Sequence, residues 1–198
     1  MQNGVSYSVN TNGEWSTPIT IPIKNDYNIS MHENRFVNLK TGVIISSVNR
    51  ADSHGERDLY VSFWNGDYAS EPINMGSILN TEFEESSPFL ANDNVTLYFA
   101  SKGHHGLGGF DIYVTERLDD SWLNWSKPRN LGRAVNGTND DEFFTITHCG
   151  RYGMFSKQIS VHNYDLYKVG MSDLFGPSEL KPAIKQEGES RPVFFADL

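Results

Sequence analysis

The strongest constraint on the fold is a repeat that runs along most of the chain with a period of 53 to 56 residues. The tripeptides Asp58-Leu59-Tyr60, Asp111-Ile112-Tyr113 and Asp165-Leu166-Tyr167 recur at spacings of 53 and 54 residues. Prolines recur with the same period, at Pro18, Pro72, Pro128 and Pro182. Independent landmarks that share one period indicate that a single structural unit is repeated.

Each repeat contains four short runs of β-branched and aromatic residues, separated by Gly, Asn, Asp or Pro. In the middle repeat these runs cover residues 87–91, 95–101, 111–116 and 127–131. No stretch has the periodicity of an amphipathic helix. Four antiparallel strands in every unit of this length predict an all-β chain made of β-propeller blades.

The repeat boundaries predict a single β-propeller domain or propeller segment over residues 1–198. The chain contains either about four blades that close on themselves or a segment of a larger propeller. The expected divisions are a partial blade over 1–25, repeats over about 26–80, 81–136 and 137–188, and a closing or partial strand over 189–198.

The middle repeat reads SSPFLANDNVTLYFASKGHHGLGGFDIYVTE and ends in WSKPRNLGRAVNGTNDDEF. This sequence resembles the WD40-like β-propeller repeat of the TolB type, and the other repeats keep parts of it. The resemblance implies a bacterial cell-envelope protein in the periplasm or outside the cell. The N-terminal residues MQNGVSYSVNTNGEW lack the basic and apolar regions of a signal peptide, so the sequence leaves the compartment open.

Composition excludes several classes of function. The formal net charge of −9 disfavours nucleic acid as a partner, because an acidic chain repels phosphate backbones. No apolar run is long enough for a transmembrane helix. Cys149 is the single cysteine, so an intrachain disulfide and a cysteine-based zinc cluster are both excluded. We expect no cofactor.

Residues that recur at one position in every repeat are expected to stabilise the backbone. An aspartate at the start of a strand accepts hydrogen bonds from N–H groups of the preceding loop. The tyrosines of the same tripeptides are expected to pack between blades. The glycines of the loop before Asp111 are expected to provide positive φ angles. These residues are Asp58, Asp111, Asp165, Tyr60, Tyr113, Tyr167, Gly103, Gly106, Gly108 and Gly109.

Histidines are the candidates for a functional site, because they do not belong to the repeated framework. They lie in the loops before the repeated aspartates, and acidic residues lie in the loops that join successive repeats. Antiparallel strands bring both sets of loops to one end of the sheets, where they can hold a divalent cation or hydrogen-bond a sugar. The alternative is that they are solvated loop residues. The candidates are His54, His104, His105, His162, Glu85 and Asp141.

These features favour a non-enzymatic binding or scaffold module whose loop face recognises a protein or a cell-envelope glycan. Two alternatives remain. One is a carbohydrate-active enzyme, either a glycoside hydrolase or a metal-dependent lyase, with its site on the histidine and acidic loop face. The other is a structural fragment of a larger envelope protein. An open propeller would also expose edge strands through which the chain can dimerise.

Overall fold

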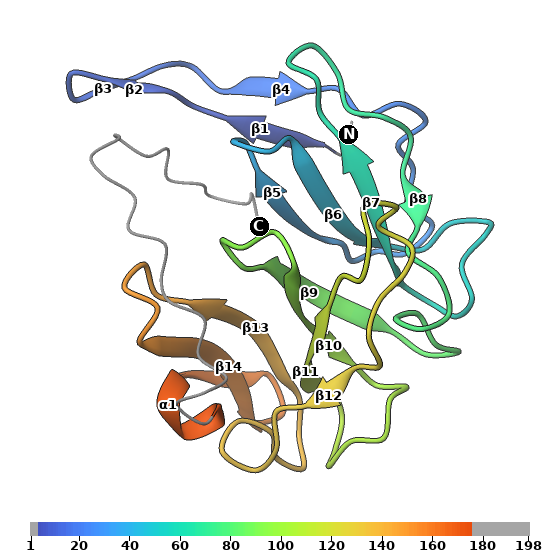
Figure 1. Cartoon of the computed structure of the whole chain (residues 1–198), viewed down its shortest axis with the longest axis vertical. Helices are drawn as coiled ribbons and strands as arrows, with labels where there is room; N and C mark the ends of the chain where they lie inside the picture. The colour runs from blue at the N-terminus through green and yellow to red at the C-terminus, as the bar shows by residue number, and fades with distance from the viewer. Residues whose placement is uncertain (1–3, 176–198) are drawn as a thin grey trace.

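The structure is a computed structural model that describes residues 4–175 of the 198-residue chain. The described residues form an all-β fold with one short helix, α1 (Met171–Leu174), which confirms the predicted all-β class. Three small antiparallel sheets follow one another in chain order, and a pair of two-stranded sheets precedes them (Figure 1). Within these residues, no helix has both the length and the apolar character needed to cross a membrane.

The first two of the three sheets have the four strands that the repeat predicts, each paired with the next strand along the chain. The first sheet contains β5 (Asn34–Asn38), β6 (Val43–Val48), β7 (Asp58–Phe63) and β8 (Ile73–Asn74). The middle sheet contains β9 (Glu85–Leu90), β10 (Thr96–Ser101), β11 (Asp111–Glu116) and β12 (Arg129–Asn130). The outermost strands β8 and β12 have two residues each, so they are shorter than predicted.

The third sheet has three strands within the described residues: β13 (Asp141–Ile146), β14 (Tyr152–Ser160) and β15 (Asn163–Gly170). The rest of the predicted third repeat, up to residue 188, and the strand predicted over 189–198 lie outside them. In place of the long loop of the middle sheet, a turn at Val161 and His162 joins β14 to β15. His162 has a φ of 60°, so the turn contains one residue in the left-handed region.

The N-terminal segment forms two short antiparallel pairs. One pair is β1 (Val5–Tyr7) with β4 (Ile19–Ile21), and the other is β2 (Asn10–Thr11) with β3 (Glu14–Trp15). Ile21 of β4 packs with Ile44 of β6 and Ala69 in a small buried cluster. The segment therefore covers one face of the first sheet.

Successive side chains of a strand point to opposite faces of its sheet, so the two faces of a sheet pack against different neighbouring elements. Leu59 of β7 lies in a buried cluster with Leu90 of β9, between the first and middle sheets. Ile112 of β11 lies in a second buried cluster with Phe144 of β13, between the middle and third sheets. The innermost strands β5, β9 and β13 also contact one another in succession. The middle sheet is therefore covered on both faces.

Candidate functional site

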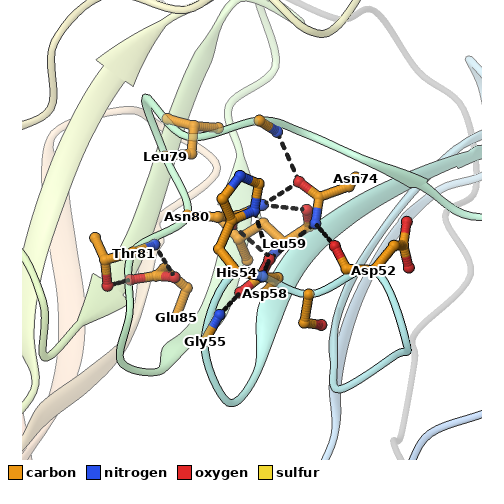
Figure 2. Close-up of polar contacts among 12 residues, drawn as sticks. Asp52, His54, Gly55, Asp58, Leu59, Asn74, Leu79, Asn80, Thr81 and Glu85 are labelled. Atoms are coloured by element: carbon orange, nitrogen blue, oxygen red, sulfur yellow. Dashed lines mark hydrogen bonds and ion pairs between the residues drawn. The ribbon is translucent and has the colours of Figure 1, made fainter.

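The loop before β7 is held by the carboxylate of Asp58, which is fully buried. Asp58 Oδ2 accepts hydrogen bonds from the backbone N–H of His54 at 2.7 Å and from Asn74 Nδ2 at 2.8 Å (Figure 2). His54 Nδ1 lies 3.2 Å from the same oxygen. The carboxylate thus supplies acceptors for a loop that has no strand partner of its own.

Asn80, which follows β8, binds the backbone of Leu59, the residue after Asp58 in β7. Asn80 Oδ1 accepts from the backbone N–H of Leu59 at 2.8 Å, and Asn80 Nδ2 donates to the carbonyl of Leu59 at 3.0 Å. Its Nδ2 also donates to Asn74 Oδ1 at 2.8 Å. The amide side chain therefore binds β7 as a neighbouring strand would, at a point where β8 has already ended (Figure 2).

Glu85, at the start of β9, is a second fully buried carboxylate. It accepts hydrogen bonds from the backbone N–H of Thr81 at 2.9 Å, from Thr81 Oγ1 at 2.7 Å and from Ser101 Oγ at 2.8 Å. Burial nevertheless raises the pKa of Glu85 to about 7, because the charged form loses its hydration. The side chain joins the start of β9 to the end of β10.

The same assembly recurs one repeat later, around the fully buried Asp111. Asp111 accepts from the backbone N–H groups of Leu107 and Gly108. Asn136 Oδ1 accepts from the N–H of Ile112 at 2.8 Å, and its Nδ2 donates to the carbonyl of Ile112 at 2.9 Å. The expected structural role of Asp58 and Asp111 is therefore seen in both four-stranded sheets.

Asp141 takes the position of Glu85 in the third sheet and is bound differently. Its Oδ2 accepts from the N–H of Gly137 at 2.6 Å, and its Oδ1 lies 2.8 Å from Lys157 Nζ. Lys157 occupies the strand position that Ser101 occupies in the middle sheet, because each pairs directly with the acidic residue. A lysine ion pair has replaced a serine hydrogen bond.

The glycines before Asp111 allow close approach between loops, which corrects the expectation that they provide positive φ angles. None of the four has a φ in the left-handed region. A Cβ on Gly103 would collide with the side chain of Thr81, and one on Gly108 would collide with the backbone of Thr138. One repeat earlier, a Cβ on Gly55 would collide in the same way with the backbone of Glu82, which lies in the loop that begins the middle sheet. Each long loop thus lies directly against the loop that begins the next sheet.

The structure does not bring the four candidate histidines into one metal site. The described residues include no group of three or more His, Cys, Asp or Glu side chains that could hold a metal ion. His104 is half-buried against Phe99 and Tyr113, and its Nε2 donates to the carbonyl of Leu79 at 2.9 Å. Burial lowers the pKa of His104. His105 and His162 are exposed.

Two of the three repeated tyrosines are buried, and one of them, Tyr113, packs as expected in the cluster between the first and middle sheets. Tyr60 and Tyr113 are buried, and each hydroxyl donates to the loop above it: Tyr60 to Asp52 Oδ1 at 3.0 Å and Tyr113 to the carbonyl of His104 at 2.9 Å. Tyr167 stacks on Phe155 but remains partly exposed. Asp165 is also exposed, and the short turn before it leaves no long loop for its carboxylate to hold.

A charged cluster where the innermost strands meet was not predicted from the sequence. Glu84 accepts from Arg57 Nε at 3.1 Å and from Lys102 Nζ at 2.5 Å, so it joins the first and middle sheets. Glu142 of β13 accepts from Ser86 Oγ at 2.9 Å, and burial raises the pKa of Glu142. Arg57 and Glu142 belong to other repeats than Glu84 and Ser86, so one repeat read alone does not reveal these contacts.

At the loop end of the sheets, buried acceptors hold the bases of the loops and leave their tips exposed. Phe83 is 55% exposed and Leu107 is 40% exposed. Their loops are adjacent, because the N–H of Lys102 donates to the carbonyl of Glu84 at 3.0 Å. The loop tips therefore form an exposed surface of apolar and polar side chains. The repeated aspartates of the first two sheets, Asp58 and Asp111, hold the bases of the loops below it.

Comparison with protein-family models, with curated proteins and with solved structures finds no match.

Proposed function

We propose that this chain is a non-enzymatic binding module built from β-propeller repeats of the TolB type, and that it recognises a protein partner through its loop end. The period of 53 to 56 residues supports the propeller assignment. So do successive antiparallel sheets whose innermost strands contact one another. The resemblance of the middle repeat suggests a periplasmic or extracellular setting.

The observation that carries the proposal is the use of Asp58 and Asp111 as loop anchors. Each carboxylate is fully buried and accepts backbone N–H groups of the loop before it. A carboxylate committed in this way cannot leave its site to act as an acid or base without releasing the loop. A binding role needs such anchors, because a loop that is already ordered loses less entropy when a partner binds.

The exposed groups at this end favour a protein as the partner. Phe83 and Leu107 supply apolar contact area. The exposed Glu82 directly precedes Phe83, and the exposed His105 lies two residues before Leu107. Apolar anchors with a polar surround are typical of the energetic centre of protein interfaces.

The test is capture of a partner by three versions of the full chain from an envelope extract of the source cells. The face variant combines Phe83→Ser with Leu107→Ser. The control is Leu118→Ser, which changes a side chain that is 58% exposed in the loop between β11 and β12, at the opposite end of the sheet. We expect the wild-type chain and the control to capture the same protein and the face variant to lose it. Equal capture by all three would contradict the proposal.

A thermal-shift measurement separates the protein partner from a glycan or a metal. A ligand at one hundred times its dissociation constant stabilises the folded chain by roughly 2.7 kcal/mol, which raises the melting temperature by several degrees. We expect no shift with peptidoglycan fragments or with divalent metal ions. A shift with peptidoglycan fragments that the face variant abolishes would instead assign the loop end to glycan binding.

A further inference from the structure

One face of the third sheet carries exposed apolar side chains. Leu166 of β15 is 69% exposed, and strand pairing places it directly opposite Ser156 and two residues from Lys168, which pairs with Met154. On the opposite face of the same strands, Phe155 and Val169 pack in the cluster shared with the middle sheet. We call the exposed side the outer face of the third sheet; it comprises Tyr152, Met154, Ser156, Tyr164, Leu166 and Lys168.

The corresponding face of the other two sheets is covered by the strand that begins the next repeat. Leu59 and Ile112 occupy the position of Leu166 in their repeats, and both are fully buried. Leu59 packs in one cluster with Leu90 of β9, the innermost strand of the following sheet. The repeat therefore predicts an innermost strand against Leu166.

The chain contains a second copy of that strand's sequence beyond the described residues. Residues 189–197 read ESRPVFFAD, and β9 begins the matching sequence ESSPFLAND at residues 85–93. Glu, Ser, Pro and the final Asp coincide, and Phe194 falls at the position of Leu90. We propose that residues 189–196 dock on the outer face of the third sheet, as β9 docks on the first sheet.

The polar side chains of the segment fit the same arrangement. Ser86 and Glu142 occupy equivalent positions in successive sheets, and Ser86 Oγ donates to Glu142 Oε1 at 2.9 Å. Ser190 occupies this position in the segment. Docking would put Ser190 beside Glu142, on the side away from Ser86, so that a second hydroxyl faces a carboxylate whose pKa is already raised by burial. Arg191 stands at the position of Ser87 in the sequence, so docking would also bring a positive charge near Glu142.

The intervening chain is long enough for this path. Residues 176–188 provide 13 residues between α1 and the segment. An extended chain of that length spans roughly 40 Å. Crossing a three-stranded sheet and passing to its outer face requires roughly 20 Å, from strand spacings of about 5 Å and a sheet separation of about 10 Å.

A double-mutant cycle in the full-length chain tests the proposal. The single variants are Leu166→Ala and Phe194→Ala, and the measured quantity is the unfolding equilibrium constant of each variant and of the double variant. Contacting residues are coupled, so we expect the double variant to depart from the product of the single effects by at least about threefold. The control pair is Leu166→Ala with Val193→Ala. Val193 matches Phe89, which is next to Leu90 on a strand and so points to the opposite face; here we expect agreement within about twofold.

Two results would overturn the proposal. Effects of Leu166→Ala and Phe194→Ala that multiply within twofold would mean that the segment does not contact the outer face. A second copy of the chain could cover that face instead. In that case sedimentation would show a dimer, and Leu166→Asp would convert it to a monomer without any coupling to Phe194.

Discussion

The middle and third sheets share the same repeated sequence pattern, but neighbouring sheets cover them to different extents. In the middle sheet, Asp111, Ile112 and Tyr113 are all buried, and the loop before them is held by the aspartate. In the third sheet, Asp165, Leu166 and Tyr167 are exposed, and a short turn replaces the loop. The tripeptide therefore sets a pattern of strand and side-chain direction, while burial comes from the sheets on either side.

The largest expected effect is on the core that the middle sheet shares with the third. Ile112→Ala removes a fully buried side chain, and we expect the free energy of unfolding to fall by about 3 kcal/mol. Ile159→Ala on β14 removes a half-exposed side chain of the same kind, and a change within about 0.5 kcal/mol is expected. Denaturant unfolding of both variants measures the difference. Equal losses would mean that the third sheet is as fully packed as the middle one.

Substitution of the repeated aspartates in the two sheets should also change the free energy of unfolding by different amounts. Asp111→Ala leaves the N–H groups of Leu107 and Gly108 without their acceptor, and we expect a loss of about 2 to 3 kcal/mol. Asp165→Ala changes an exposed residue beside a short turn, with an expected loss within about 0.5 kcal/mol. Thermal unfolding of the two variants checks this prediction. A large loss for Asp165→Ala would show that its carboxylate has a structural role after all.

The close approach of loops between sheets can be tested by adding one methyl group. Gly108→Ala places a Cβ against the backbone of Thr138, so the two loops must separate, at an expected cost of about 2 kcal/mol. Gly4→Ala is the control, because a Cβ there would make only an ordinary contact with Thr20. Hydrogen exchange in the loops 102–110 and 137–140 should increase in Gly108→Ala. Unchanged exchange would argue against the contact.

The smallest expected effect concerns the pH dependence of stability. Burial raises the pKa of Glu85 to about 7 from an ordinary value of 4.5, so the folded chain binds a proton that the unfolded chain releases. The stability gained from this group is complete below about pH 4.5 and is lost as the pH rises through 7. Glu85→Gln keeps an acceptor for Thr81 and gains a donor for Ser101, but it has no proton to lose.

We therefore expect Glu85→Gln to reduce the loss of stability between pH 5 and pH 8.5 by about 1 to 2 kcal/mol. Chemical denaturation at the two pH values provides the measurement. The exposed Glu14→Gln variant removes one carboxylate elsewhere and serves as the control. An unchanged pH dependence in Glu85→Gln would show that the buried carboxylate stays charged.

The sequence predicted the strands better than it predicted the contacts among loops. Residues 111–116 were expected as a strand and form β11 with those bounds, because a β-branched and aromatic run between turn residues has few other options. The run 127–131 is reduced to Arg129 and Asn130, where the Asn136 side chain takes over hydrogen bonding to β11. One side chain that takes over the hydrogen bonds of a strand leaves no periodic pattern in the sequence from which it could be predicted.

The candidate site was predicted only in part, for a related reason. Strand direction correctly brings Glu85 and the His104 loop to neighbouring positions at one end of the sheets, since both are tied to Ser101. It does not show where an individual imidazole points, and His104 turns away to the carbonyl of Leu79. The glycines were assigned to backbone conformation when their role is to admit a neighbouring backbone. That contact involves residues about 30 positions away, so one loop read alone contains no sign of it.

Because each loop is anchored at its base, the residues at its tip can be substituted without changing the fold. Asp111 and Asn136 fix the two ends of the assembly through backbone groups, so they place no demand on the side chains between residues 104 and 107. In the loop 102–110, space constrains Gly103, Gly106, Gly108 and Gly109, and contacts with Leu79, Phe99 and Tyr113 constrain His104. A library that varies His105 and Leu107 and keeps the glycines, together with His104, would sample new recognition surfaces without rebuilding the frame. The repeat is in this sense a ready platform for selecting binders.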